Sequence, residues 1–261
     1  MRIVLKPIFL LFSALTLSLS TYGQMDRLFA PFDCRRHAEL GIEKTVTDTL
    51  SQVSIQALQV VEAPTPVIEI DTIDAWKKWR TVENFTYGKD RGTMPMIVEL
   101  NALHPYFRDR IVDLINTCEA QGIHLAIVES YRTHAKQHEY KSMGKKYTRS
   151  GAGKSKHQYG LAVDVVPIVD SIAMWDDKNL WKRIGIVGEH LGLRWGGRWR
   201  TPYDPGHFEW TGGISTSELS IGKLPPIVNK DSYPCIEEDV RLLRKYWKEW
   251  EGEVQKSYAR N

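Results

Sequence analysis

The residues Ser-Lys-His-Gln-Tyr-Gly-Leu-Ala-Val-Asp at 155–164 and Asp-Pro-Gly-His-Phe-Glu at 204–209 decide the interpretation of this chain. Two imidazoles together with one carboxylate are a ligand set typical of catalytic zinc sites, whose fourth position stays open for water. A second carboxylate nearby can accept a proton from that water. The expected metal ligands are His157, Asp164 and His207, and the expected base is Asp204.

Both stretches carry a family pattern. The first resembles S-x-H-x-x-G-x-A-x-D and the second resembles D/E-x-x-H, two motifs of the zinc peptidases that cut bacterial wall peptides. The spacing between the first histidine and the aspartate is a weak signal by itself, because it is not the i, i+4 spacing of a helical ligand pair. The metal-binding interpretation therefore depends on the matched positions, which are Ser155, His157, Gly160, Ala162 and Asp164.

The resemblance extends to both sides of these motifs. Upstream it includes Leu-His-Pro at 103–105, Ser-Tyr-Arg at 130–132 and Gln137, and downstream it includes Gly-Leu-Arg-Trp-Gly-Gly-Arg-Trp at 192–199. It therefore covers roughly residues 84–212 of the 261. The Leu-His-Pro and Trp-Gly-Gly segments look most like the L-alanyl-D-glutamate endopeptidase branch of the family, whereas other members are D-alanyl-D-alanine carboxypeptidases.

The resemblance also implies roles for residues around the ligands. Arg132 matches the arginine that holds substrate and stabilises the negative oxygen formed during hydrolysis, and a structural salt bridge is its alternative role. Asp204 would accept a proton from water and donate one to the leaving amine, with Glu209 as the second candidate for that base. Further residues are expected to line the site or support the ligands, namely Ser155, Gln137, Tyr159 and Trp195. Core packing explains Trp195 and Trp199 equally well.

These roles imply a hydrolase that cuts a peptide bond in peptidoglycan stem peptides with one zinc ion per chain. Cleavage between L-alanine and D-glutamate is the expected specificity, and a D,D- or L,D-carboxypeptidase acting on the same peptides is the main alternative. The loop at residues 145–156 holds five Lys or Arg residues, which form either a lip that attracts peptide carboxylates or a solvated surface. A hypothesis of another class is a non-catalytic, zinc-containing wall-binding protein, which predicts a lost base or a fourth protein ligand.

The chain is expected to divide into four parts. Residues 1–23 combine Arg2 and Lys6 with an apolar run of about twelve residues, which is typical of a secretory signal peptide and too short to span a bilayer. We expect cleavage near Gly23, export to the periplasm or cell envelope, and no stable membrane insertion afterwards. The parts are a signal peptide at 1–23, an N-terminal extension at 24–80, a zinc peptidase domain at 81–213 and a C-terminal extension with an amphipathic helix at 214–261.

Charge and cysteine content narrow the partners. The first 23 residues carry two bases and no acids, so the rest of the chain has 33 Lys and Arg against 32 Asp and Glu. This balance shows no footprint of nucleic-acid binding, and we expect a monomer whose partner is the stem peptide.

In an oxidising compartment two of the three cysteines can pair. Cys118 falls on the apolar face of a predicted helix, so Cys34–Cys235 is the expected bridge, with three unpaired thiols as the open alternative.

Hydrophobic spacing predicts the order of helices and strands. Expected helices lie at 105–121, 180–191 and 236–250, with another that begins after Thr133 and ends near Gly144. Expected strands lie at 124–128, 160–168 and 207–210. These elements alternate irregularly and no glycine-rich phosphate loop follows a strand, which favours an α+β domain with a small antiparallel sheet. The family resemblance implies a fold of the same kind, with zinc in a groove on the sheet.

Overall fold

The computed structural model describes residues 79–258. The expected signal peptide at 1–23, nearly all of the expected extension at 24–80, and Cys34 lie outside the described residues. Within residues 79–258, no helix combines the length and the apolar character that are needed to cross a membrane.

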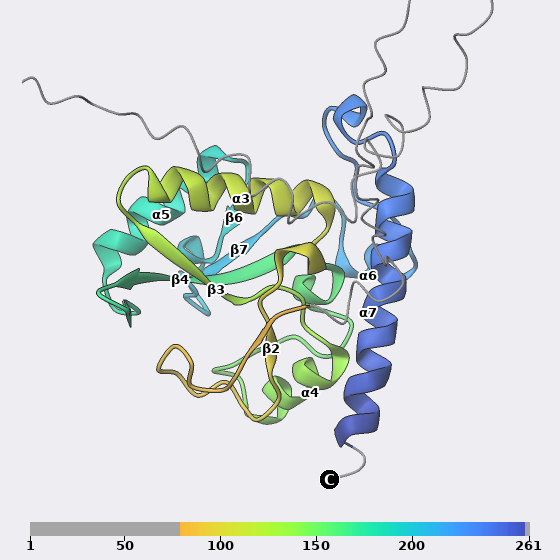
Figure 1. Cartoon of the computed structure of the whole chain (residues 1–261), viewed down its shortest axis with the longest axis horizontal. Coiled ribbons are helices and arrows are strands. Elements are labelled where there is room, and N and C mark those ends of the chain that lie inside the picture. The colour runs from red at the N-terminus through yellow and green to blue at the C-terminus, as the bar shows by residue number, and fades with distance from the viewer. Residues whose placement is uncertain (1–78, 259–261) are drawn as a thin grey trace, which may run out of the picture. The chain divides into compact units, whose positions relative to one another are not determined.

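A small antiparallel sheet forms the centre of the described chain. Its strands follow the order β3–β4–β7–β6, every neighbouring pair is antiparallel, and β5 pairs with the end of β4 (Figure 1). The strand bounds are β3 His124–Glu129, β4 Ala162–Val169, β5 Ile172–Ala173, β6 Arg194–Trp195 and β7 His207–Glu209. A separate two-stranded sheet pairs β1 (Thr81–Val82) with β2 (Met96–Ile97). The expected α+β fold with a small antiparallel sheet is therefore confirmed.

Helices α3 (Pro105–Glu119) and α5 (Lys178–His190) pack beside each other against one face of this sheet (Figure 1). Helix α3 buries the apolar residues whose helical spacing predicted it: Phe107, Ile111, Leu114 and Cys118. Helix α5 begins after Asp177, whose carboxylate accepts hydrogen bonds from the backbone N–H groups of Asn179 and Leu180 at 3.0 and 2.9 Å. This cap satisfies N–H groups that have no partner inside the helix.

The two faces of the sheet differ because side chains alternate along each strand. Phe208 of β7 points to the helix layer and packs on Gly188 of α5, where a Cβ atom would lie 2.4 Å from the phenylalanine ring. Its neighbours His207 and Glu209 therefore point to the opposite face. Asp164 of β4 is paired directly with His207, so its side chain shares that face. The polar residues of the candidate site thus project from the face that α3 and α5 do not cover.

The connections between these elements hold several short helices. Thr133 caps α4 (His134–Ser142) as the sequence predicts, because its hydroxyl accepts a hydrogen bond from the backbone N–H of Lys136 at 3.1 Å. The other short helices are η4 Leu100–Ala102, η5 Lys156–Tyr159, η6 Gly196–Arg198, α6 Thr216–Ser220 and η7 Lys230–Ser232.

The C-terminal helix α7 (Ile236–Tyr258) packs on the rest of the described chain (Figure 1). The Trp247 indole stacks on Tyr131, with ring centroids 4.8 Å apart and planes at 7°, and donates a hydrogen bond to the Ala102 carbonyl at 2.9 Å. Gly160 has a φ of +62°, and a Cβ atom there would lie 2.7 Å from the Trp247 ring, so this position favours glycine twice over. Helix α7 therefore packs directly behind the turn that ends η5.

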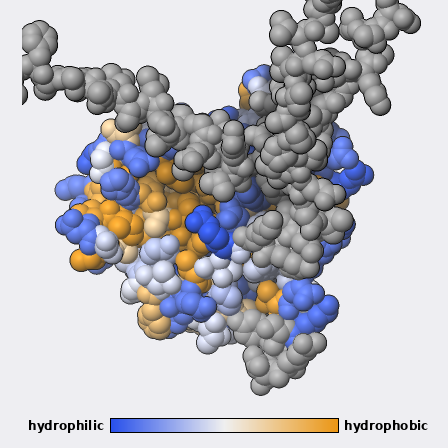
Figure 2. Space-filling model, viewed as in Figure 1, coloured by the Kyte–Doolittle hydropathy of each residue, from blue (hydrophilic) through white to orange (hydrophobic). Residues whose placement is uncertain are grey.

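Exposed apolar side chains mark the β4–β5 hairpin. Val169 is 46% exposed and Ile172 is 64% exposed. Figure 2 shows hydrophobic residues interspersed with hydrophilic ones on the side of the view where this hairpin lies. Scattered exposure of this kind is ordinary for a folded protein.

Two cysteines lie within the described residues. Cys118 is a buried free thiol on α3, as its position on the apolar face predicts. Cys235, just before α7, is disulfide-bonded, which excludes three unpaired thiols. Its expected partner Cys34 lies outside the described residues, so the Cys34–Cys235 pairing stays a prediction.

Candidate metal centre

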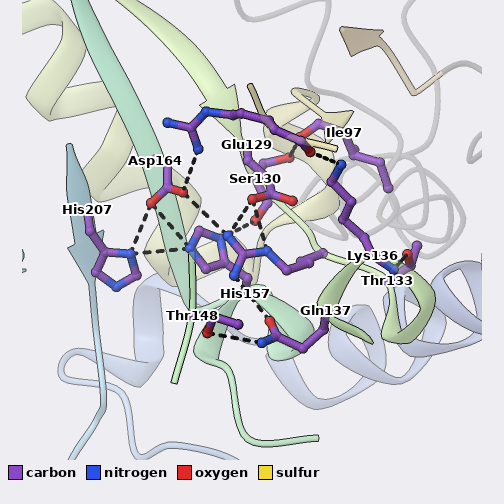
Figure 3. Close-up of polar contacts among 12 residues, drawn as sticks. Ile97, Glu129, Ser130, Thr133, Lys136, Gln137, Thr148, His157, Asp164 and His207 are labelled. Carbon is purple, nitrogen blue, oxygen red and sulfur yellow. Dashed lines mark hydrogen bonds and ion pairs between the residues drawn. The ribbon is translucent and has the colours of Figure 1, made fainter. Parts of the chain in front are cut away.

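Three side chains from two strands and one short helix converge on a single point. The closest donor atoms are Nε2 of His157, Nδ1 of His207 and Oδ1 of Asp164, and Figure 3 shows the three side chains pointing toward one another. Oδ1 of Asp164 lies 3.0 Å from His207 Nδ1 and 3.4 Å from His157 Nε2, and the two histidine nitrogens are 3.3 Å apart. All three residues are buried. The structure thus brings together the three residues that the sequence motifs single out as ligands.

The outer nitrogen of each histidine has its own partner. His157 Nδ1 donates to the Ser130 carbonyl at 3.0 Å, which leaves its Nε2 lone pair directed at the centre. His207 Nε2 donates to Glu209 Oε2 at 3.2 Å, so Nδ1 is the nitrogen that faces the same point. Contacts of this kind hold the ring and its tautomer in the state that can bind a metal.

Glu209 therefore lies behind a histidine and away from the open side of the centre. Its second oxygen accepts a hydrogen bond from Arg194 at 2.6 Å, and both contacts hold the carboxylate in place. Burial alone would raise the pKa of Glu209, but the hydrogen bond with His207 lowers it. From the sequence, Glu209 was expected only as a second candidate for the base. Its position two residues after His207 on one strand was the signal for its contact with the ring, because such residues share a face.

Asp164 divides its two oxygens between the histidines and two arginines. Oδ1 faces the imidazoles, whereas Oδ2 lies 3.4 Å from Arg132 and 3.7 Å from Arg91. Burial would raise the pKa of Asp164, but the charges and hydrogen bonds of His157 and His207 hold it well below its usual value. The carboxylate is therefore ionised, as a metal ligand must be.

The donor set and its spacing fit zinc. Tetrahedral zinc with ligands at about 2.0–2.1 Å requires its donor atoms to lie roughly 3.3 Å apart. The three separations of 3.0, 3.3 and 3.4 Å come close to that value. Two imidazoles and one carboxylate are also ligands that zinc prefers. Burial opposes protonation of His207, yet hydrogen bonds to Asp164 and Glu209 raise its pKa to about 10, so metal binding must displace a proton.

Asp204 lies in the loop before β7, at the edge of the same centre. Its carbonyl accepts a hydrogen bond from His207 N at 3.2 Å, and its own N–H donates to the Gly196 carbonyl at 3.2 Å. Burial and the neighbouring charge of Asp164 raise the pKa of the Asp204 carboxyl. Asp204 therefore forms part of the turn before β7 and also borders the cavity.

The Arg132 guanidinium is directed toward protein side chains, although the family resemblance implies that it holds substrate. Its Nε donates to Glu129 at 2.9 Å, a second guanidinium nitrogen also contacts Glu129, and the third donates to Gln137 at 3.1 Å. Burial opposes the charge, but Glu129 raises the pKa of Arg132 above its usual value. The side chain borders the cavity, and each of its three guanidinium nitrogens has at least one protein partner. The structure thus favours the salt-bridge role, in which Arg132 also holds Asp164.

The remaining expected residues separate into two groups. Ser155 borders the cavity. Gln137 is fully buried, and its side chain contacts Arg132 and Ser150 and donates a hydrogen bond to Thr148 (Figure 3). The Tyr159 hydroxyl donates to the Gly153 carbonyl at 2.7 Å and supports that loop.

Trp195 lies in the core. Its indole donates to the Pro205 carbonyl at 2.8 Å, and its ring packs on Gly185 of α5. Among the residues described, the cavity lining includes neither Tyr159 nor Trp195. Trp199, and not Trp195, borders the cavity. The centroid of its ring lies 5.1 Å from that of the His207 ring.

The centre opens into a cavity of about 850 Å³. Sequence reasoning missed several of its lining residues: Lys89, Arg91, Tyr140 and Trp175. The first two lie in an irregular segment and the last in a loop, where no helical or strand pattern marks them. Only the tertiary structure brings them beside the metal ligands.

Comparisons with known proteins agree with the family resemblance. Residues 148–210 match the sequence model of the D-alanyl-D-alanine carboxypeptidase family. The chain is 29% identical over 121 residues to the peptidoglycan L-alanyl-D-glutamate endopeptidase CwlK of Bacillus subtilis (strain 168), which covers 41% of this chain and 72% of that protein.

Two solved structures are also similar. One is the Serratia marcescens L-Ala D-Glu endopeptidase ChiX, at 26% identity and a TM-score of 0.36, covering 43% of this chain and 83% of that one. The other is a mutant of the vancomycin-resistance D,D-pentapeptidase VanY in complex with Zn(II), at 18% identity and a TM-score of 0.31, covering 62% of this chain and 89% of that one.

The segment matched by the family model contains all three donor residues of the candidate centre and Asp204. The family resemblance read from the motifs is therefore confirmed. Residues 148–210 are similar to the D-alanyl-D-alanine carboxypeptidase family, and together with the similarity to CwlK this supports a peptidase.

Proposed function

We propose that the chain is a zinc-dependent endopeptidase that cuts the bond between L-alanine and D-glutamate in peptidoglycan stem peptides. The observation that carries this proposal is the set of three donors 3.0–3.4 Å apart beside a second carboxylate, Asp204, at the edge of a cavity. The similarity to CwlK supports the choice of bond. The proposed ligands are His157, Asp164 and His207, which would bind one zinc ion per chain.

The residues of the chain divide the work of hydrolysis. When bound, zinc supplies a Lewis acid that polarises a carbonyl and acidifies water. Asp204 would take a proton from the attacking water on its carboxylate and return a proton to the leaving amine. Arg132 and Glu209 would keep Asp164 and His207 in position.

The alternative of another class is a zinc-containing wall-binding protein without activity. It predicts the loss of the base or a fourth protein ligand. Within the described part of the chain, the candidate metal cluster has three members and Asp204 borders the cavity, so neither feature is found there. The site therefore supports hydrolysis.

A D,D- or L,D-carboxypeptidase is the second candidate function. It is favoured by the match of residues 148–210 to the D-alanyl-D-alanine carboxypeptidase family. Digestion of purified peptidoglycan, with and without a chelator, separates the two when the products are identified by mass spectrometry. The proposed endopeptidase leaves L-alanine carboxyl termini on the glycan and frees peptides that begin with the amine of D-glutamate. Release of D-alanine alone, with the stem peptides still attached to the sugar, would establish the carboxypeptidase.

The proposed substrate requires export, which we also propose. The amino terminus of the protein recovered from the cell envelope provides the test. A first residue near Gln24 is expected after signal-peptide removal, whereas protein that retains Met1 in the membrane fraction would contradict processing.

A further inference from the structure

Two cations from one irregular segment reach the cavity beside the metal centre. Lys89 and Arg91 both border the cavity, and both lie over the indole ring of Trp175. The Lys89 ammonium is 4.0 Å from the ring centroid and the Arg91 guanidinium carbon is 5.2 Å from it. Residues 84–94 that carry the two cations are called the basic arm below. An aromatic face at such distances stabilises cations and limits the orientations of their side chains.

The basic arm is held on the domain by hydrogen bonds at several points. Trp175 donates to the Tyr87 carbonyl at 2.7 Å, and Asn84 accepts a hydrogen bond from Arg91 N at 2.6 Å. Glu139 of α4 accepts hydrogen bonds from Thr93 N and Oγ1 at 2.5 and 2.7 Å. Protein side chains that are already ordered lose little entropy when a ligand binds. The arm therefore presents its cations in a prearranged position.

Arg91 keeps more donors available than Arg132 does. Its nearest carboxylate oxygen, Asp164 Oδ2, is 3.7 Å from a terminal guanidinium nitrogen, which is longer than a hydrogen bond. Among the described residues, the buried Nε of Arg91 has no hydrogen-bond partner. Arg132, by contrast, directs its guanidinium nitrogens to Glu129 and Gln137. Arg91 is therefore the guanidinium at the centre with more N–H groups left to bind an incoming anion.

A neutral donor lies close to this cation. Tyr140 borders the cavity and is only 3% exposed, and its hydroxyl has no hydrogen-bond partner within the described part of the chain. The charge of Arg91 acts on the Tyr140 hydroxyl, although burial is the main cause that raises the pKa of this tyrosine. A buried polar group without a partner is costly, so a ligand oxygen that reaches it would stabilise the site.

We propose that Arg91, assisted by Lys89, binds the carboxylate of the substrate residue that supplies the leaving amine. This inference rests on the proposed peptidase function and names the substrate group that its cavity recognises. Arg91 lies 3.7 Å from a proposed metal ligand, so an anion that it binds must lie within a few atoms of the cut bond. A guanidinium presents two parallel N–H donors that match a carboxylate. In a stem peptide, the α-carboxylate of D-glutamate is attached to the same carbon as the amine that leaves.

The test pairs two peptides with two arginine variants. Peptides are prepared in which L-Ala is joined to the amine of D-Glu and the γ-carboxyl of D-Glu is joined to the next residue. The α-carboxylate of D-Glu is either free or converted to an amide. The wild-type, zinc-loaded protein is expected to prefer the free acid in kcat/KM by about tenfold or more, as a charge-assisted hydrogen bond allows. Arg91→Gln should abolish this preference, because it should lower kcat/KM for the acid, mainly through a raised KM, much more than kcat/KM for the amide. Arg91→Lys should recover only part of the preference, because lysine lacks the planar fork.

A control variant and a binding measurement complete the experiment. Lys182→Gln removes a positive charge from the exposed surface of α5 and should leave the preference unchanged. Calorimetry of both peptides on zinc-loaded Asp204→Ala protein should show the same preference for the acid, and Arg91→Gln in that background should remove it.

Each other outcome contradicts the proposal in a distinct way. Equal losses for acid and amide in Arg91→Gln would mean that Arg91 only supports the fold or the metal ligands. A wild-type protein that cuts both peptides equally would exclude the carboxylate subsite while leaving the proposed hydrolysis in place. If the protein neither cleaves nor binds either peptide, both proposals are overturned.

Discussion

Asp164 of β4 and His207 of β7 face each other across two antiparallel strands, with Asp164 Oδ1 3.0 Å from His207 Nδ1. Because the two residues are direct partners in the strand register, the sheet itself sets the distance between two of the proposed ligands. A slip of one residue in either strand would turn one of these side chains into the helix-covered face. The geometry of the metal centre therefore depends on the same hydrogen bonds that hold the sheet together.

Removal of either histidine ligand should release the metal. His157→Ala and His207→Ala each leave two donors, and zinc sites of this kind need three protein ligands. Metal analysis of the purified wild-type protein is expected to find about one zinc per chain, and analysis of either variant should find most of it lost. His124→Ala is the control, because His124 is an exposed residue of β3 with 68% of its side chain accessible. Full zinc retention in either ligand variant would exclude the assignment.

Loss of the Asp204 carboxylate should stop turnover without loss of the metal. A general base contributes on the order of 10²–10⁴-fold, so kcat of Asp204→Ala should fall at least about a hundredfold. Zinc content and the unfolding temperature should stay close to those of the wild type. Asp176→Asn, another carboxylate that borders the cavity, is the matched control. A rate near that of the wild type in Asp204→Ala would mean that this residue is not the base.

The charge of Glu209 should strengthen metal binding through His207. Glu209→Gln keeps the size of the side chain but weakens the acceptor for His207 Nε2, and contacts of this kind typically contribute about 10–100-fold to metal affinity. Competition with a chromogenic chelator at fixed pH should measure the loss. Glu253→Gln on the exposed surface of α7 should show no loss. If both variants bind zinc equally well, the contact with Glu209 does not affect the metal.

Truncation of Trp247 should destabilise the whole described domain. This side chain is 5% exposed and packs on Tyr131, and deletion of a buried tryptophan typically costs about 3–5 kcal/mol in the free energy of unfolding. Urea unfolding of Trp247→Ala should therefore show a clearly lower midpoint. Ile221→Ala, at a residue that is 83% exposed, should leave the midpoint unchanged. An unchanged midpoint for Trp247→Ala would mean that α7 does not support the domain in solution.

The ion pair between His134 and Glu251 should make the attachment of α7 depend on pH. His134 Nδ1 lies 2.8 Å from Glu251, and this hydrogen bond raises the pKa of His134 in the folded state. A histidine whose pKa is higher when folded contributes stability that is fully present below its unfolded pKa of about 6.5 and is lost as pH rises through the folded pKa. Glu251→Gln should therefore reduce the free energy of unfolding more at about pH 6 than at about pH 9.

Two variants check the source of that pH dependence. His134→Ala should remove it, because the titrating group is absent. Glu253→Gln, at an exposed position of the same helix, should leave it as in the wild type. An equal effect of Glu251→Gln at both pH values would instead assign the role of Glu251 to its hydrogen bond with the Tyr131 hydroxyl, which is 2.7 Å long.

The sequence by itself determined the fold class, the main elements and the three converging donors. Helical spacing located α3, and Thr133 marked the start of α4, because hydrophobic period and capping are local properties of a chain. The strands β3, β4 and β7 were also found, although β4 begins at Ala162 and β7 ends at Glu209, two residues later and one residue earlier than predicted; the two-residue strands β1, β2, β5 and β6 were not. The two family motifs singled out the donors through their matched positions, since the spacing alone is a weak signal.

Only the tertiary structure decided which side chains surround those donors. Arg132 is directed to Glu129, and Trp199 rather than Trp195 borders the cavity, because alternation along short irregular segments cannot be read from residue types. Lys89 and Arg91 reach the centre through contacts with Trp175, which lies more than 80 residues away in the chain. Contacts between segments so far apart depend on how the sheet, the loops and α7 pack together, and no local pattern in the sequence records that packing.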